Sequence, residues 1–383
     1  MLQEIARPEV AMEKLCLIFN IPALYRKSIY EEIDKTYDCD WYFADTDSDI
    51  ERMDTSNLHN VRFYKTVGNP NKAYWQRGII SLLFNRNYRR FLMVAETRSV
   101  SCWIFFWLAF LFFPHKKIHI WTHGWYGKES AWEAKMKLWL YRHVSRIFLY
   151  GNYAKKLLAE KGIPEEKMFV LHNSLDYRHH LALRQTIVPS PVFARHFHND
   201  YPTIVFIGRL TRVKRLEMLV AALSELKRKD AYCNLVFVGD GVLREELEAQ
   251  VVRDGLEEQV WFYGACYDDA KSAELIYNAD LCVSPGNVGL TAIHALSFGT
   301  PVITHDCFAR QMPEFESIVP GVTGDFFEQD RVESLTGVIE RWLREKTSCR
   351  EEVRASCFRE IDTQWNPAFQ IEVIKNNLDF AND

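Results

Sequence analysis

Two cationic side chains lie close together near the middle of the sequence. Arg209 and Lys214 follow the apolar run Thr203 to Ile207 and the glycine Gly208, which lets the backbone turn closely. The run predicts a strand, and a helical pattern starts near Lys214. Across the loop between strand and helix, the two side chains can converge on one polyanion. The alternative interpretation is a solvated basic loop.

A second candidate anion site lies in the stretch from Asp280 to Phe327. Its residues predict a buried strand at Leu281 to Val283, a short helix from Gly289, and a helix stop at Gly299. The helix dipole and the N–H groups of residues 288–291 would hold a phosphate without any cationic side chain. The alternative is an ordinary βαβ corner with no ligand.

The third candidate is a histidine at the end of a predicted strand. The run Ile118 to Thr122 ends at His123 and Gly124, and the aromatic residues Trp125 and Tyr126 follow. In parallel α/β sheets the carboxyl ends of the strands hold the ligands. A histidine at such a place therefore indicates a functional role more strongly than a lone core histidine does.

An acidic turn, DTDSD, at Asp45 to Asp49 contains the spacing DxD. Two carboxylates at this spacing can hold a divalent cation, but no third ligand is evident in the sequence. Acidic clusters in loops are most often solvated, and we predict that this turn binds no metal.

The composition is that of an ordinary globular protein that has room for two domains. The chain has 383 residues, of which 48% are hydrophobic and 26% are charged. Its nine cysteines show no CxxC spacing, and the N-terminus has no signal-peptide pattern. We therefore expect reduced thiols and a cytoplasmic protein.

Charge is unevenly distributed along the chain. Residues 1–183 carry 26 Lys and Arg against 20 Asp and Glu, whereas the remainder carries 21 against 31. The basic first half indicates an anionic surface partner for that half only. No RRM, KH, zinc-finger or basic-arm signature is present, and we predict no nucleic-acid partner.

Short apolar runs alternate with helical patterns through the first half, which predicts a parallel, doubly wound sheet. The predicted strands are Lys14 to Phe19, Asp40 to Ala44, Val61 to Tyr64, Phe91 to Ala95, Ile118 to Thr122 and Ile147 to Tyr150. We predict a first lobe at residues 1–183, a proline-rich linker at 184–202, a second α/β lobe at 203–345, and a helical tail at 346–383 that packs back on the first lobe.

One segment of the first lobe has two interpretations. Val100 to Phe113 contains fourteen residues without a charge, which is too short to span a bilayer. It is either a helix packed under the sheet or an element that enters a membrane interface. In the second case, flanking basic residues would contact anionic lipid headgroups. These residues are Arg86, Arg89, Arg90, Arg98, Lys116 and Lys117.

The second half resembles a known family along its whole length. The segments GRLTRVKRLEMLVAAL, LVFVGDGVLREELE, VWFYGACYDD, ADLCVSPGNVGLTAIHALSFGTPVITHD and PEFESIVPGVTGDFF follow one another as in retaining glycosyltransferases of the GT-B fold. The chain is similar to bacterial family 4 members that build capsule, O-antigen and exopolysaccharide chains. The resemblance in the first half rests on HGWYGKE and LHNSLD.

The resemblance implies two Rossmann-like lobes facing a cleft, with a nucleotide-sugar on the second lobe, an acceptor on the first and no metal requirement. It assigns Arg209 and Lys214 to the pyrophosphate and His123 to the donor sugar. Gly208, Gly124, Trp125 and Tyr126 would lie at the cleft. The loop at Trp261 to Ala265, with Tyr263 and Gly264, would contact the base, and Gly289, Leu290 and Thr291 would bind phosphate.

The sequence departs from this family at two carboxylates. Where the family has a glutamate, seven residues and another glutamate, this chain has Gly286 and His294. Asn287 is a candidate for the sugar contact, and His294 for a ribose contact with an ordinary histidine pKa near 6.5. Glu314 and Glu316 are further candidates from the neighbouring loop, although Glu316 matches a glutamate that is usual in the family.

Taken together, these features predict a glycosyltransferase. It would move a hexose or deoxyhexose from a nucleotide-sugar to a lipid-linked or oligosaccharide acceptor, with retention and without a metal or other cofactor. It would be cytoplasmic and peripheral on the inner face of the membrane. Two alternatives stay open: a catalytically weak binding homologue that serves as a partner subunit, and a sugar-nucleotide epimerase of the same fold.

Overall fold

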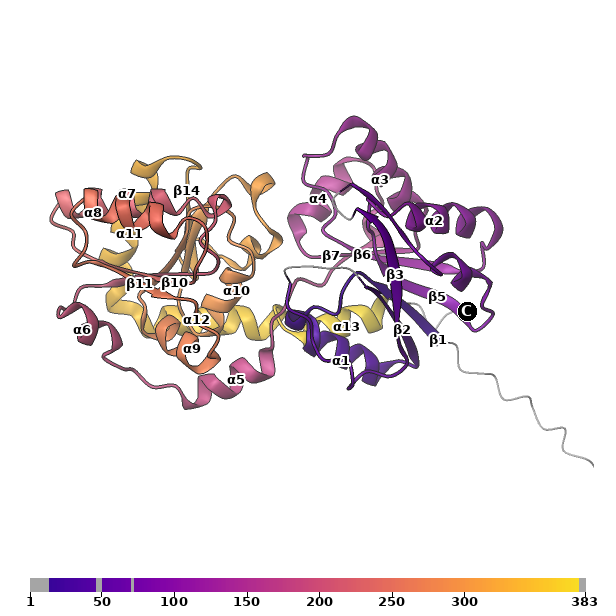
Figure 1. Ribbon diagram of the computed structural model, residues 1–383, viewed down its shortest axis with the longest axis horizontal. Coiled ribbons are helices and arrows are strands. Elements are labelled where there is room, and N and C mark those ends of the chain that lie inside the picture. Colours follow the sequence, from indigo (N-terminus) through magenta and orange to yellow (C-terminus); the bar gives the residue numbers. More distant parts are fainter. Residues whose placement is uncertain (1–13, 46–49, 70–71, 379–383) are drawn as a thin grey trace, which may run out of the picture.

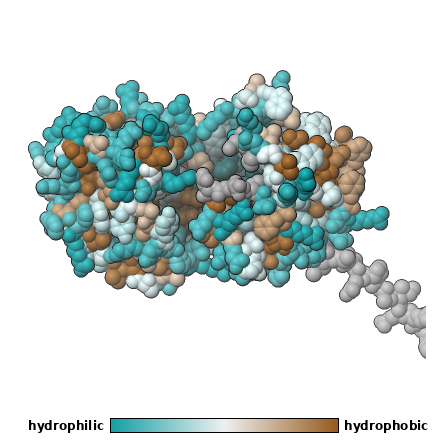
Figure 2. All heavy atoms as spheres, viewed as in Figure 1, coloured by the Kyte–Doolittle hydropathy of each residue, from teal (hydrophilic) through white to brown (hydrophobic). Residues whose placement is uncertain are grey.

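The computed structural model describes residues 14–45, 50–69 and 72–378. The chain forms two α/β lobes that lie side by side, each built around its own sheet (Figure 1). A hollow separates the lobes on the face seen in Figure 2. The predicted architecture of two Rossmann-like lobes is confirmed.

The first lobe holds an eight-stranded sheet in the order β4-β3-β2-β1-β5-β6-β7-β8. The strands are β1 (Lys14–Phe19), β2 (Cys39–Asp45), β3 (Val61–Asn69), β4 (Ala73–Gln76), β5 (Tyr88–Val94), β6 (Lys117–Thr122), β7 (Arg146–Leu149) and β8 (Met168–Val170). The central strands are buried on both faces, which explains their continuous apolar runs.

One edge of this sheet differs from the prediction. The strand expected at Val61 to Tyr64 extends to Asn69 and pairs antiparallel with β4, whereas the other pairs in the sheet are parallel. The expectation of an all-parallel sheet is therefore wrong at this edge. A parallel partner needs a crossover of a dozen or more residues, and the connection from β3 to β4 is too short for one.

The second lobe holds a six-stranded parallel sheet in the order β11-β10-β9-β12-β13-β14. Its strands are β9 (Thr203–Ile207), β10 (Asn234–Val238), β11 (Val260–Gly264), β12 (Leu281–Ser284), β13 (Val302–His305) and β14 (Gly324–Phe327). The order reverses between β9 and β12, and in doubly wound sheets ligands bind beside such a reversal.

Helices cover both sheets and connect the lobes (Figure 1). Those of the first lobe are α1 (Lys27–Thr36), α2 (Val100–Phe112), α3 (Ala131–His143) and α4 (Asn152–Glu160). The others are α5 (Tyr177–Thr186), α6 (Val192–Phe197), α7 (Leu216–Arg228), α8 (Arg244–Arg253), α9 (Asp269–Asn278), α10 (Leu290–Ser297), α11 (Val332–Lys346), α12 (Arg350–Gln364) and α13 (Pro367–Asn377).

The segment predicted as the linker between the lobes contains helical structure. Residues 184–202 include the end of α5 and all of α6, and Pro191 precedes the first turn of α6. Its prolines lie between the two helices and near the following strand, where no helical N–H is needed. The boundaries proposed from the sequence for the lobes stay a prediction.

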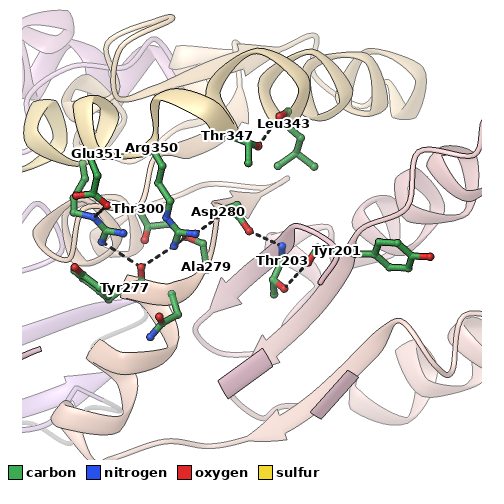
Figure 3. Close-up of polar contacts among 12 residues, drawn as sticks. Tyr201, Thr203, Tyr277, Ala279, Asp280, Thr300, Leu343, Thr347, Arg350 and Glu351 are labelled. Atoms are coloured by element: carbon green, nitrogen blue, oxygen red, sulfur yellow. Dashed lines mark hydrogen bonds and ion pairs between the residues drawn. The ribbon is translucent and has the colours of Figure 1, made fainter. Parts of the chain in front are cut away.

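The C-terminal tail contacts both lobes. Arg350 at the start of α12 donates to Asp280 Oδ1 at 2.8 Å and to the carbonyls of Tyr277 and Ala279, each at 2.9 Å (Figure 3). Asp280 Oδ2 in turn accepts the N–H of Thr203 at 2.8 Å. The chain then crosses between the lobes, and α13 lies against α1 (Figure 1).

The uncharged segment from Val100 to Phe113 forms helix α2, which is buried on one face and exposed on the other. Cys102, Phe105, Phe106 and Ala109 are buried, whereas Leu111 and Phe112 are 65% and 66% exposed. The buried face fits the interpretation of a helix packed under the sheet. The exposed apolar residues fit the interpretation of an element that enters a membrane interface. No helix within the described residues is long and apolar enough to cross a bilayer.

Two of the basic residues expected to meet lipid headgroups are buried instead. Lys116 donates to the carbonyls of Asn85 and Tyr88 at 2.8 and 2.5 Å, and Arg90 is almost fully enclosed. These interactions replace the water that a charge loses on burial. The expectation was wrong for these two side chains, while Arg86, Arg89 and Arg98 are exposed.

Candidate active site

The two cations predicted to bind a polyanion lie at the carboxyl edge of the second sheet. Arg209 is exposed just after β9, and Lys214 ends the short 3-10 turn Arg212–Lys214. Burial, with a further effect of the Arg209 charge, lowers the pKa of Lys214 to about 8, and the charge of Glu314 opposes this. Two cations close enough to affect one another favour an anionic ligand between them.

Lys214 also binds the loop that follows β12. The Nζ of Lys214 donates to the carbonyl of Asn287 at 2.6 Å. The backbone carbonyl of Lys214 accepts the N–H of Gly286 at 2.9 Å. A Cβ at position 286 would lie 2.0 Å from the carbonyl oxygen of Val213 and 2.7 Å from the Cα of Lys214. The two loops therefore pack backbone to backbone, and only glycine fits at position 286.

The N-terminus of α10 begins beside this loop. Its N-cap residue Gly289 has a φ of 56° and provides no side-chain cap. Leu290 and Thr291 form the first turn, and the Thr291 hydroxyl donates to the carbonyl of Ile207 at 3.1 Å. Gly208 lies next to this hydroxyl, since a Cβ there would be 3.7 Å from Thr291 Oγ1. Backbone N–H groups and the cations thus share one edge of the sheet.

One of the N–H groups expected to bind phosphate is already used. The N–H of Val288 donates to Gln311 Oε1 at 2.9 Å, and Gln311 Nε2 donates to Thr304 Oγ1 at 2.8 Å. The expectation for Val288 is wrong, because the buried Gln311 side chain satisfies this donor. The helix start from Gly289 onward stays the candidate anion site.

His123 lies opposite, in the first lobe, at the end of β6. It lines a cleft of about 330 Å³ together with Gly124 and Tyr126 and with Gln311, Met312 and Pro313 of the second lobe. The His123 ring is exposed to the cleft, yet desolvation by the surrounding protein, aided by the Arg26 and Lys137 charges, lowers its pKa to about 4. Its imidazole is therefore neutral at pH 7 and can accept or donate one hydrogen bond.

The second-lobe residues that line this cleft also pack against the N-terminus of α10. Gln311 holds the N–H of Val288, and Met312 lies 3.8 Å from a Cβ built on Gly289. The predicted phosphate-binding residues and His123 therefore border one interlobe space. A ligand with an anionic part and a neutral polar part would contact both.

The residues after His123 do not all face the cleft. Gly124 and Tyr126 line it, and the hydroxyl of Tyr126 is buried without a hydrogen-bond partner in the part of the chain that the structure describes. Trp125 instead packs into the hydrophobic core of the first lobe. The placement of Trp125 at the cleft was wrong, because the left-handed turn at Gly124 directs the next side chain inward.

His294 is packed between helices rather than free to titrate near neutral pH. Its ring stacks on His180 of α5 with centroids 5.3 Å apart, and it also contacts Phe298. Burial lowers the pKa of His294 to about 4. The expected ordinary pKa, and with it a gain of nucleotide affinity below pH 6.5, is therefore wrong. The ribose contact stays a prediction.

The segment expected to read the base is a strand with an aromatic flank. Trp261 and Tyr263 belong to β11, and Gly264 ends it with a φ of 91°. Trp261 stacks on His196 of α6 with centroids 3.9 Å apart. The base-reading segment predicted at Trp261 to Ala265 thus overlaps the end of a strand, and Tyr263 and Gly264 lie at the carboxyl end of that strand, where ligands bind.

Glu314 and Glu316 have separate surroundings. Glu316 Oε2 accepts the N–H of Asn152 at 2.6 Å, and Oε1 accepts the N–H of Tyr153 at 2.7 Å. It therefore caps α4 of the other lobe, which makes the donor-sugar role expected for Glu316 wrong. Glu314 is 2% exposed and accepts from Asn173 Nδ2 at 2.8 Å.

The structure adds functional candidates that the sequence did not single out. Arg26 is buried beside the cleft, donates to the Tyr150 hydroxyl and lies over the Trp121 ring, 5.5 Å from its centroid. Glu129 and Lys137 form an ion pair of 3.2 Å in the wall of the His123 cleft. Glu129 belongs to the motif HGWYGKE, so the sequence pointed to it. No sequence pattern distinguished Arg26 from an arginine on the surface.

No cluster of three or more His, Cys, Asp or Glu that could hold a metal occurs among residues 14–45, 50–69 and 72–378. The acidic turn at Asp45 to Asp49 lies outside the described residues except for its first member.

Two Rossmann-like lobes with this cleft define a GT-B fold. The fold matches that of Anabaena Alr3699/HepE in complex with UDP, with a TM-score of 0.71 at 14% identity; the match covers 95% of this chain and 99% of that one. Residues 192–357 match the glycosyl transferases group 1 family, so the second lobe contains a glycosyl transferases group 1 domain.

Curated relatives match part of the chain. An uncharacterized glycosyltransferase of Methanocaldococcus jannaschii is 32% identical over 190 residues, 47% of each chain. The lipopolysaccharide 1,6-galactosyltransferase of Salmonella typhimurium is 25% identical over 194 residues, 49% of each chain. The chain thus spans about half the length of these relatives.

Proposed function

We propose that the protein is a glycosyltransferase that moves a hexose or deoxyhexose from a nucleotide-sugar to a lipid-linked or oligosaccharide acceptor. The observation that carries the proposal is the convergence at the cleft. Lys214 and the start of α10 provide positive charge on one lobe, and the neutral His123 faces them from the other. Fixed cations stabilise the charge that a leaving nucleoside diphosphate develops.

The group 1 domain and the GT-B fold support this donor half. Structures of Anabaena Alr3699/HepE with UDP and with UDP-glucose make these two compounds the first probes for this chain. Arg209, Lys214 and the helix start would bind the diphosphate, and Tyr263 and Gly264 would lie beside the base. We propose that this charge makes a divalent metal unnecessary and that transfer retains the anomeric configuration.

The acceptor half rests on the first lobe. Its basic composition and the exposed apolar face of α2 fit an acceptor carried on an anionic membrane surface. We propose that the protein works at the inner face of the cytoplasmic membrane, in the synthesis of a bacterial surface polysaccharide such as capsule or O-antigen.

One observation favours a second candidate, a binding subunit with little catalysis. Position 286 has no space for the family's first glutamate, and His294 replaces the second. A protein that lost both contacts could bind a nucleotide-sugar without transferring the sugar.

Acceptor-dependent release of nucleoside diphosphate separates the two candidates. Purified protein is incubated with a panel of nucleotide-sugars and bacterial lipid-linked glycans, with and without EDTA. A transferase releases the diphosphate only when both substrates are present, and EDTA does not stop it. Binding without acceptor-dependent release across the panel would favour the binding subunit. The product's anomeric configuration is then read by NMR.

A further inference from the structure

The carboxyl group of Glu314 is buried between the lobes with only half of its hydrogen bonds made. Oε1 accepts from Asn173 Nδ2 at 2.8 Å, whereas Oε2 is buried and has no hydrogen-bond partner among the described residues. Buried polar atoms in folded proteins nearly always have partners, and an exception calls for an explanation. A bound ligand that supplies a donor is one such explanation.

The electrostatic neighbours of Glu314 come from both sides of the cleft. Burial raises the pKa of Glu314, and the hydrogen bond from Asn173 and the charges of Lys214 and Arg26 oppose this. Burial raises the pKa of Tyr126 and of Tyr150 in the first lobe, and the charge of Glu314 adds to both shifts. Pro313, its neighbour in the chain, lines the His123 cleft. Glu314 is therefore buried directly behind Pro313, in the wall of the His123 cleft.

The loop that carries Glu314 is tied to position 286. The single hydroxyl hydrogen of Thr304 is shared between the carbonyls of Ser284 and Gly286, at 2.8 and 3.0 Å from Oγ1. Gln311 Nε2 donates to the same Oγ1 at 2.8 Å. Gln311 also accepts the N–H of Val288. These hydrogen bonds hold the 311–314 segment against the loop that contains Gly286. At that position a glutamate side chain has no space.

We propose that Glu314 supplies the carboxylate contact to a hydroxyl of the donor sugar that position 286 cannot supply. The inference rests on the proposed function, since it names a contact within the same donor site. Glu314 Oε2 accepts the sugar hydroxyl, and Asn173 holds the other oxygen in place. Glu314 is thus a specificity-determining residue for the sugar, with no part in binding the nucleotide.

The test compares a nucleotide with and without its sugar. UDP and UDP-glucose, then GDP and GDP-mannose, are titrated by calorimetry into wild type, Glu314→Leu, Glu314→Gln and a control, Glu328→Gln. Glu328 lies on the surface and pairs with Arg331 at 3.0 Å. The pair of compounds that binds wild type is then used for all variants.

We expect Glu314→Leu to bind the sugar nucleotide about tenfold more weakly, the effect of losing one hydrogen bond to a charged acceptor. Glu314→Gln, which keeps an acceptor oxygen and removes the charge, should lose about threefold. Affinity for the sugar-free nucleotide should stay within about twofold of wild type in both. The control should match wild type for both compounds. If Glu314→Leu does not fold, Glu314→Gln alone carries the comparison.

Unchanged affinity for the sugar nucleotide in both Glu314 variants would overturn the inference and leave Glu314 as a contact between the lobes. An equal loss for both compounds would also overturn it, because Glu314 would then act on the whole cleft. If wild type binds none of the four compounds, that result contradicts the proposed donor site itself, and the two failures are distinguishable.

Discussion

At the scale of single residues, His123 is the best candidate for an effect on the reaction step. Its neutral ring faces the cleft in which we place the donor sugar, and charge would develop on that sugar during transfer. We expect His123→Ala to lower kcat by about 10²-fold or more while donor affinity falls only a few fold. Steady-state kinetics together with donor titration check this. Equal losses in affinity and in kcat/KM, with kcat unchanged, would make His123 a ground-state contact.

The half-buried His294 predicts how stability depends on pH. Burial lowers the pKa of His294 to about 4, against about 6.5 in an unfolded chain. Between these values the unfolded state binds more protons, so the free energy of unfolding falls as the pH falls. His294→Gln should lose less stability between pH 7 and pH 5 than wild type does, by up to about 2 kcal/mol. Urea unfolding at both pH values measures the difference; identical losses would contradict the buried assignment.

Sequence reasoning located the residues whose role depends on local structure. Arg209, Lys214 and Gly289 follow strands in one chain segment each, and the edge of a parallel sheet brings such positions together. Predictions from the sequence were wrong for side chains whose surroundings come from distant segments of the chain. Glu316 meets α4 across the lobes, His294 meets His180 of α5, and Trp125 turns into the core, and no local pattern encodes these contacts.

At the scale of elements, a carboxylate from one lobe caps a helix of the other. Glu316 accepts the first N–H groups of α4, whose N-cap, Gly151, has no side chain. A Cβ on Gly151 would lie 2.4 Å from Glu316 Oε1. We expect Gly151→Ala and Glu316→Gln each to lower stability by about 1 kcal/mol, the typical effect of losing a cap. Combining them should cost less than their sum, because both break one interaction. Additive losses in denaturant unfolding would show that the cap is not shared.

Helix α2 is the element expected to contact a membrane. Leu111 and Phe112 are exposed at its end, and the same lobe also exposes Arg86, Arg89 and Arg98. We expect the protein to bind vesicles of anionic lipid at low salt, less so at high salt, and Leu111→Ser with Phe112→Ser to weaken binding several fold. The matched control replaces Val242 and Val252, exposed apolar residues of the second lobe, with serine. Flotation that leaves wild type with the soluble fraction, or that affects both double variants equally, would contradict a role for α2.

At the scale of the whole molecule, the connections allow the two lobes to act on one ligand. The chain crosses between them at α5 and again between α12 and α13, and Glu316 and Glu314 make polar contacts across the cleft. The fold class followed from alternating strands and helices, whereas the antiparallel edge and the return of α13 to α1 depend on connection lengths and tertiary packing. We place the nucleotide-sugar in the cleft between the lobes.

The most direct test of that central claim is titration of UDP and GDP into wild type, Arg209→Ala and Lys214→Ala, with Arg253→Ala as a surface control. We expect wild type to bind one of the nucleotides. Each of the two cleft variants should weaken that binding by about 1.5 to 3 kcal/mol, the value of a hydrogen bond to a charged group, while the control stays unchanged. Unchanged affinity in both cleft variants would contradict the assignment of the diphosphate to this edge of the second lobe.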